Sequence, residues 1–124
     1  GELEDMTQNN TRVNLTIALN YGGRDEVARA VKRMAEDIET GKICAQDVTE
    51  NTLTRYLDTH VLPDPDLVIR TSGEARVSNF LLWQAAYSEY EFVKTLWPDF
   101  TRDIFAQIVG DFAKRDRRFG AVKS

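Results

Sequence analysis

The sequence has little cysteine, no long apolar run and no excess of positive charge, and each absence excludes a class of protein. Its single cysteine, Cys44, cannot form an internal disulfide, which is typical of a reducing compartment. No apolar run reaches the roughly 18 residues that a membrane span needs, and no signal peptide is visible. The formal net charge of −4 argues against a broad nucleic-acid-binding face. We therefore expect a cytoplasmic protein that binds no nucleic acid and whose anion sites are local.

The composition is that of a globular protein. Hydrophobic residues make up 42% of the 124 residues and aromatic residues 10%, so disorder over the whole chain is not expected. A chain of this length forms one domain at most. We expect residues 1–124 to be a single domain with a modest hydrophobic core.

Periodic apolar positions predict an alternation of strands and helices. Apolar side chains at every second position from Val13 to Leu19 indicate a strand. Spacings of three and four from Val27 to Ile38 indicate a helix, which Gly41 ends. The remaining expected elements are a short helix opened by Thr49, strands at 67–69 and 90–93, a buried helix at 79–87 and a final helix from Thr101 to Gly120.

This order of elements predicts an α/β fold with a mostly parallel sheet and helices on both faces. The expected strands lie at 13–19, 67–69 and 90–93. Three strands make a thin sheet, and parallel sheets need both faces covered. We therefore expect these strands to be part of a larger sheet.

A polar turn with two arginines follows the strand at 67–69. Arg70 comes directly after the strand, and Arg76 lies six residues further on. Ligands of open α/β sheets bind beyond the carboxyl ends of the strands, and a guanidinium group matches phosphate oxygens. Ser78 is a suitable N-cap for the helix expected at 79–87, whose free N–H groups would face an anion. The turn therefore predicts a phosphate or diphosphate site, and a surface ion pair of these arginines with Glu74 or Asp66 is the alternative.

The residues around this turn carry a family resemblance. Ile-Arg-Thr-Ser-Gly-Glu-x-Arg-x-Ser-Asn-Phe-Leu-Leu-Trp-Gln at 69–84, followed by Ala-Tyr-Ser-Glu at 86–89, resembles the cis-prenyltransferases, and within them the bacterial undecaprenyl diphosphate synthases. Three further segments agree, namely Asn20–Arg24, Trp97–Phe100 and Arg117–Gly120. The resemblance runs from about Thr7 to Gly120, which is nearly the whole chain.

The resemblance implies an activity, substrates and partners. It implies a transferase that condenses isopentenyl diphosphate onto farnesyl diphosphate and yields undecaprenyl diphosphate, the lipid carrier of cell-wall synthesis. It further implies Mg²⁺ as cofactor, a homodimer, and contact with the inner face of the membrane through the lipid product. A dolichol-type synthase shares many of these motifs, so the physiological product stays open.

The resemblance also implies roles for individual residues. The isopentenyl diphosphate would be held by Arg70, Arg76, Val77 and Ser78, and by Arg118 and Gly120, which reach the partner subunit's site or else only end a helix. Glu89 would bind magnesium, with Glu74 as the second choice. Asn20, Gly22, Gly23 and Arg24 would form an active-site loop, or else only a tight turn in which Arg24 pairs with a phosphate or an acid.

Two motifs of the resembling family are absent from the sequence. The Asp-Gly-Asn motif, whose aspartate holds the allylic diphosphate through magnesium, and the Ser-x-Glu-Asn segment do not occur. The chain thus resembles the C-terminal half of such an enzyme, and we assign no catalytic residue within it. A catalytically inactive diphosphate-binding or dimerisation fragment is the alternative function, and a general phosphate-binding α/β protein is a third.

Overall fold

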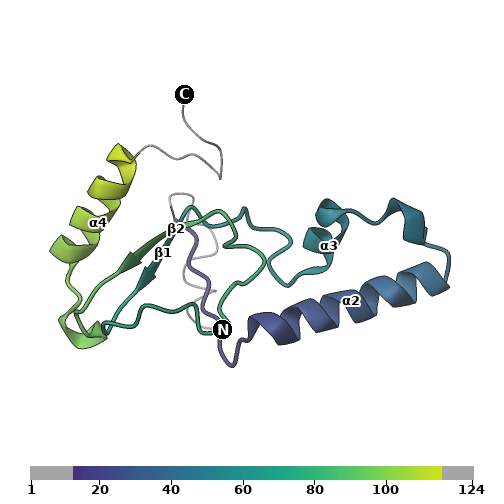
Figure 1. Ribbon diagram of the computed structural model, residues 1–124, viewed down its shortest axis with the longest axis horizontal. Helices are drawn as coiled ribbons and strands as arrows, with labels where there is room; N and C mark the ends of the chain where they lie inside the picture. The colour runs from purple at the N-terminus through teal and green to yellow at the C-terminus, as the bar shows by residue number, and fades with distance from the viewer. Residues whose placement is uncertain (1–12, 116–124) are drawn as a thin grey trace.

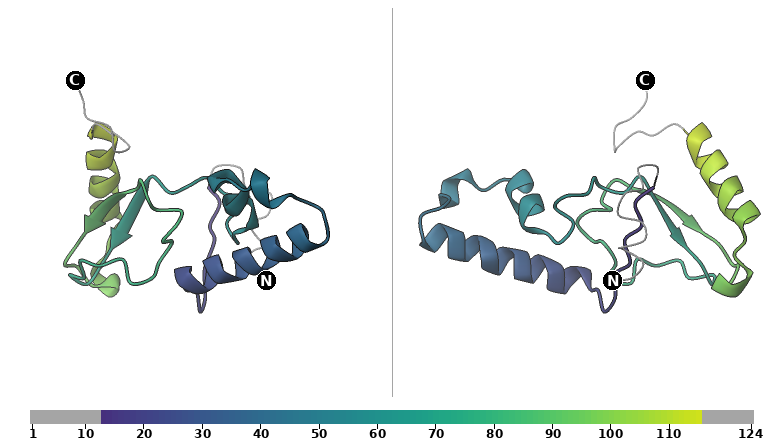
Figure 2. Two further views of the ribbon diagram at one scale, coloured as in Figure 1. Left: turned by 45° about the vertical axis from the view of Figure 1, so that its right-hand side comes forward. Right: turned by 180° about the vertical axis from the view of Figure 1, so that it is seen from behind.

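The structure is a computed structural model that describes residues 13–115. Two groups of elements lie at opposite ends of an elongated molecule, as all the views show (Figures 1 and 2). Helices α2 and α3 pack together at one end, and strands β1 and β2 lie with helix α4 at the other. The bounds are α2 Gly23–Glu39, α3 Glu50–Tyr56, β1 Leu67–Arg70, β2 Glu89–Phe92 and α4 Arg102–Lys114, with short 3₁₀ turns at Ala45–Asp47 and Trp97–Asp99.

The end of α2 and the start of α3 lie where local signals predict. Asp25 lies in the first turn of α2, where the helix dipole favours an acid. The helix ends before Gly41, whose φ of 81° only glycine adopts readily. Thr49 caps α3, because its hydroxyl accepts from the backbone N–H of Thr52 while the Thr52 hydroxyl accepts from the Thr49 N–H. Both predicted helix boundaries are confirmed.

Strands β1 and β2 form a parallel pair, in which Leu67 lies opposite Glu89 and Arg70 opposite Phe92. Two of the predicted strands, at 67–69 and 90–93, are therefore confirmed with bounds shifted by one residue. Every residue of β1 is half-buried. Helix α4 follows, capped as predicted by the hydroxyl of Thr101, which accepts from the N–H of Ile104. It ends at Lys114, because Arg115 has an extended backbone, so the predicted end at Gly120 is wrong.

The expected strand at 13–19 is not part of the sheet. The sheet of the described residues has two strands rather than three. Val13, Leu15, Ile17 and Leu19 are between 63% and 82% exposed. An alternating pattern gives a segment a face to bury, but a strand also needs a neighbour for its backbone groups. The α/β class with parallel strands is confirmed, whereas the count of three strands is wrong.

The expected buried helix at 79–87 is also wrong. The segment forms successive turns, and Phe80, Leu82 and Tyr87 are exposed. Asn79 and Leu81 have φ values of 63° and 47°, which a right-handed helix cannot contain. The apolar composition indicated burial, yet only Gln84 and Ala85 of this segment are buried.

Candidate functional site

The predicted diphosphate turn lies at the carboxyl end of β1. Arg70 is the last residue of this strand and is half-buried. The backbone N–H of Ser72 donates to Thr95 at 2.9 Å, and that of Gly73 donates to Val93 at 2.9 Å. Both donors belong to residues with positive φ, which turns the chain back toward the exit of β2. The start of the turn is therefore tied to the sheet, and Arg70 lies at the sheet edge where the sequence predicted it.

Arg76 lies further along the same turn in an exposed ion pair. Its Nε is 2.7 Å from Glu74 Oε2, and its side chain is 72% exposed. The surface ion pair that the sequence left open is thus present. Exposed pairs of this kind contribute little to stability, so an incoming diphosphate could take the place of Glu74 at small cost.

Val77 and Ser78 continue this turn on the surface. The carbonyl of Val77 accepts from the N–H of Phe80 at 3.2 Å. Ser78 has a φ of 51° and is therefore not the extended N-cap of a helix. The prediction of an anion site at a helix terminus opened by Ser78 is therefore wrong. Ser78 is exposed and lies two residues after Arg76.

The loop at 20–24 packs against the far end of the turn. The N–H groups of Gly23 and Arg24 donate to the carbonyl and side-chain oxygens of Asn79 at 2.7 and 2.9 Å. A Cβ atom on Gly23 would lie 2.9 Å from Leu82 Cγ, too close for any side chain. Gly22 has a φ of −144°, so these glycines permit close approach of two segments rather than an unusual backbone angle. Asn20, with a φ of 54°, makes the sharp turn.

Glu89 lies at the opposite end of the sheet from Arg70. The strand register pairs it with Leu67, so the two residues are separated by the length of a strand, about 10 Å. Arg115 contacts Glu89 at 3.3 Å and Glu91 at 2.6 Å. These two carboxylates hold the pKa of Arg115 above its usual value, chiefly through the hydrogen bond with Glu91.

No group of three or more potential metal ligands occurs in the part of the chain that the structure describes. A half-exposed carboxylate such as Glu89 is still the donor that Mg²⁺ accepts, together with phosphate oxygens and water. Magnesium at Glu89 would require Arg115 to release this carboxylate. The other predicted binding residues, Arg118 and Gly120, lie outside the described residues.

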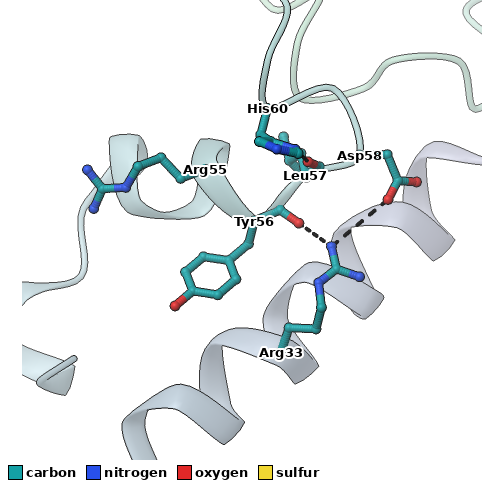
Figure 3. A pocket seen from close by; sticks show the side chains of 6 residues that line it. All are labelled: Arg33, Arg55, Tyr56, Leu57, Asp58 and His60. Atoms are coloured by element: carbon teal, nitrogen blue, oxygen red, sulfur yellow. Dashed lines mark hydrogen bonds and ion pairs between the residues drawn. The ribbon is translucent and has the colours of Figure 1, made fainter. Parts of the chain in front are cut away.

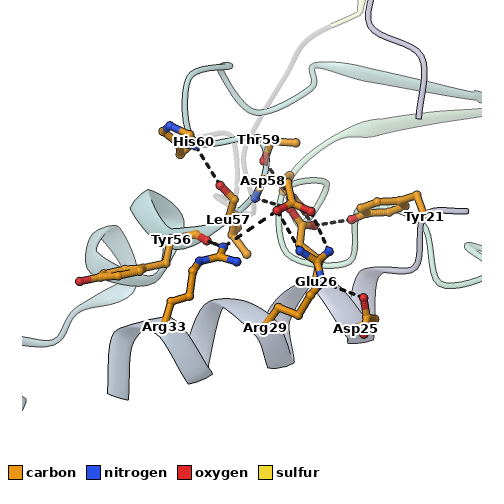
Figure 4. A network of polar contacts seen from close by, with 11 residues as sticks. Tyr21, Asp25, Glu26, Arg29, Arg33, Tyr56, Leu57, Asp58, Thr59 and His60 are labelled. Atoms are coloured by element: carbon orange, nitrogen blue, oxygen red, sulfur yellow. Dashed lines mark hydrogen bonds and ion pairs between the residues drawn. The ribbon is translucent and has the colours of Figure 1, made fainter. Parts of the chain in front are cut away.

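A buried carboxylate that sequence reasoning missed lies at the start of α2. Glu26 is fully buried and accepts hydrogen bonds from the hydroxyl of Tyr21 and the N–H of Asp58 (Figure 4). It also accepts from the amide of Gln84. Burial and the bond to Glu26 raise the pKa of Tyr21 to about 12, so its hydroxyl remains a donor at neutral pH. The signal was available, because Glu26 precedes Ala30 and Met34 at spacings of four, on the apolar face of the helix.

A groove of about 530 Å³ lies between α2 and the end of α3 (Figure 3). Arg33 donates to the carbonyl of Tyr56 and lies 3.9 Å from Asp58. The side chain of Arg55 points away from that of Arg33. Because the two guanidinium groups do not converge, the groove lacks the paired donors that hold a diphosphate.

Within residues 13–115, no helix is long and apolar enough to cross a membrane.

Known proteins are similar to this chain over nearly its whole length. A family model described as "Putative undecaprenyl diphosphate synthase" matches residues 1–120. An isoprenyl transferase of Agrobacterium fabrum is 54% identical over 121 residues, which cover 98% of this chain and 49% of the relative. An isoprenyl transferase of Clostridium perfringens is 50% identical over 119 residues, which cover 96% of this chain and 47% of the relative.

Two solved structures share the fold. Lavandulyl diphosphate synthase from Lavandula x intermedia, in complex with dimethylallyl diphosphate, matches with a TM-score of 0.88 at 34% identity, over 96% of this chain and 51% of that one. A probable undecaprenyl diphosphate synthase from Campylobacter jejuni matches with a TM-score of 0.76 at 37% identity, over 96% of this chain and 53% of that one.

These matches define the class of protein to which the chain is similar, the prenyltransferases. The chain belongs to the undecaprenyl diphosphate synthase family of prenyltransferases. It spans about half the length of the curated relatives that it matches.

Proposed function

We propose that this chain supplies the isopentenyl diphosphate site of a cis-prenyltransferase that extends farnesyl diphosphate to undecaprenyl diphosphate. The observation that carries the proposal is the position of Arg70 at the carboxyl edge of a parallel strand pair, at the start of an exposed turn that bears Arg76. Family membership supports it, as does the dimethylallyl diphosphate in the structure of the lavender relative.

In the proposed reaction, C4 of isopentenyl diphosphate attacks the allylic carbon of the growing chain. The allylic diphosphate leaves with the bonding electron pair, and a proton is lost from the isopentenyl unit. The residues of this chain would bind and orient one of the two substrates. Arg70 and Arg76 would balance the diphosphate charge, and Ser78 would add a hydroxyl donor.

Magnesium, the homodimer and the membrane contact belong to the same proposal and follow from the family resemblance. A magnesium ion held by Glu89 would offset the charge of a diphosphate group that reaches across the roughly 10 Å between Glu89 and Arg70. The residues Arg118 and Gly120 would complete the site. Asn20 and Arg24 would lie in the adjoining loop, held by Asn79.

Calorimetric titration of the chain with isopentenyl diphosphate in the presence of magnesium tests this function. We expect saturable binding that Arg70→Ala weakens at least about tenfold, the scale for losing a charged hydrogen-bond partner. Arg55→Ala is the matched control, because Arg55 is an exposed arginine on the other side of the molecule, and it should leave the affinity unchanged. Equal affinities in Arg70→Ala and the unmodified chain would remove Arg70 from the site.

A second candidate function is a diphosphate-binding or dimerisation fragment without turnover. The observation that favours it is that the turn offers two arginines to a diphosphate, Arg70 and Arg76, whereas we assign no catalytic role to any residue of the sequence. Incubation with farnesyl and isopentenyl diphosphates separates the two candidates, because formation of a longer prenyl diphosphate would contradict the inactive fragment. Binding of inorganic diphosphate as tight as that of isopentenyl diphosphate would instead favour a general phosphate-binding protein.

A further inference from the structure

The strongest polar cluster outside the arginine turn is centred on Glu26. This carboxylate is fully buried at the start of α2 and is reached by donors from three separate segments. Its Oε1 accepts from the hydroxyl of Tyr21 and, at 2.9 Å, from Nε2 of Gln84. Its Oε2 accepts from the N–H of Asp58 at 2.8 Å. A buried charge is tolerated only where several donors satisfy it, and here they do.

Gln84 is oriented by this carboxylate. Its Nε2 donates to Glu26 and to the hydroxyl of Thr59, both at 2.9 Å. Its Oε1 is buried and has no hydrogen-bond partner among the described residues. Two hydrogen bonds from one amide nitrogen to two separate segments fix the position of the Gln84 side chain.

The segment 79–84 is fixed to α2 at both of its ends. Asn79 accepts from the N–H groups of Gly23 and Arg24, and Gln84 donates to Glu26. Between these two anchors, the ring of Phe80 packs edge-on against Tyr21, with 5.6 Å between ring centres. Arg76, Val77 and Ser78 directly precede this segment. The diphosphate turn therefore has one end tied to the sheet through Gly73 and the other tied to the start of α2.

We propose that Glu26 is a positioning residue that holds the Arg76–Ser78 part of the diphosphate turn in place through Gln84 and Tyr21. The inference rests on the proposed function for the identity of the ligand. Its structural content, the anchoring of segment 79–84, can be measured without any ligand. Glu26 itself does not touch the substrate in this proposal.

Amide hydrogen exchange, followed by NMR, tests the anchoring in Glu26→Gln. The substitution preserves size but replaces one acceptor oxygen with an NH₂ group. Because both oxygens of Glu26 accept hydrogen bonds, this NH₂ group would face another donor. We expect the N–H of Gly23, which donates to Asn79, to exchange at least about tenfold faster. The N–H of Val93, which donates to Arg70 in the sheet, should exchange at its original rate. Glu36→Gln, an exposed position on the same helix, is the matched control and should change neither rate.

A second variant, Tyr21→Phe, removes one donor and leaves the carboxylate in place. It should accelerate the exchange of Gly23 by a smaller factor, and it keeps the proposal testable if Glu26→Gln does not fold. Unchanged exchange of Gly23 in both variants would overturn the anchoring. Equal acceleration at Gly23 and Val93 would also overturn it, because a loss of general stability moves both amides together.

A double-mutant cycle then tests the positioning role. Glu26→Gln should weaken the binding of isopentenyl diphosphate several-fold in the unmodified chain and have no effect when Arg76→Ala is already present. The same loss in both backgrounds would overturn the role through Arg76. If the unmodified chain does not bind isopentenyl diphosphate, or Arg70→Ala binds it equally well, the proposed function fails, and the exchange rates of Gly23 and Val93 still decide the anchoring.

Discussion

The two ends of the molecule differ in how completely they are packed. In the α2–α3 unit, residues 23–57, the face between the helices buries Ala30 and Met34, and Leu57 is 1% exposed. In the sheet–α4 unit, residues 67–70 and 89–114, Ile108 is the only buried apolar side chain among the described residues, and the strands are at most half-buried. The diphosphate turn is tied both to a unit whose apolar side chains are buried and to one whose apolar side chains are largely exposed.

The sheet–α4 unit carries exposed apolar side chains that would be buried if both faces of the sheet were covered. Phe92, Phe105 and Val109 are each at least 40% exposed. Parallel strands are normally covered on both faces. Helices α2 and α3 therefore bury apolar side chains between them, whereas β1, β2 and α4 leave much of their apolar surface exposed.

The largest effect on stability should come from a substitution in the α2–α3 unit. Leu57→Ala should lower the free energy of unfolding by about 2–5 kcal/mol, because it removes a fully buried side chain and leaves a cavity. Leu96→Ala, at a position 55% exposed near the sheet, is the control of equal chemistry and should cost far less. Urea denaturation of both variants measures the difference, and equal costs would mean that the two units are packed alike.

Two glycines allow a comparison of opposite sign. Gly23→Ala should destabilise the protein by about 1–3 kcal/mol, because its Cβ would meet Leu82 at 2.9 Å and the carbonyl of Asn79 at 3.1 Å. Gly110→Ala should stabilise it by about 0.5–1 kcal/mol, since Gly110 lies inside α4 with nothing within 4 Å of an added Cβ. Thermal unfolding gives both signs. A stabilised Gly23→Ala would refute the close approach of the two segments.

Sequence reasoning succeeded where the signal is local. Thr49, Gly41 and Thr101 mark helix ends through hydrogen bonds and backbone angles of nearby residues, so their roles could be predicted. It failed for the strand expected from Val13 to Leu19, because pairing depends on a neighbour that periodicity does not specify. It also failed at 79–87, where apolar composition alone does not distinguish a buried helix from successive turns that are mostly exposed.

The same division holds for the candidate site. The place of Arg70 at the end of a strand follows from local order and was predicted. The bridge from Arg115 to Glu89 joins residues 26 positions apart, and the bond from Gln84 to Glu26 joins residues 58 apart. No local pattern encodes such contacts, so neither could be predicted from the sequence.

The cap of α4 tests whether a local hydrogen bond stabilises the sheet–α4 unit. Thr101→Ala should destabilise the protein by about 1 kcal/mol, because the N–H of Ile104 loses the hydroxyl that accepts its hydrogen bond. Thr101→Ser retains this oxygen and should be nearly neutral. Circular dichroism during urea denaturation measures both variants. An equal loss in Ser and Ala variants would assign the effect to the methyl group rather than to the cap.

The smallest effect concerns Asp58, which ties the turn after α3 to α2. The bidentate hydrogen bond from Arg29 is the main cause that holds the pKa of Asp58 below its usual value. A lowered pKa in the folded state stabilises the protein above the unfolded value of about 3.9, and this stabilisation is lost as pH falls through the folded pKa. Since the side chain is 44% exposed, solvent screening keeps the contribution small. Asp58→Asn should therefore be slightly less stable than the unmodified protein at pH 7 and equally stable below the folded pKa, as denaturation across this range would measure. A difference that does not change with pH would show that the negative charge of Asp58 does not stabilise this turn.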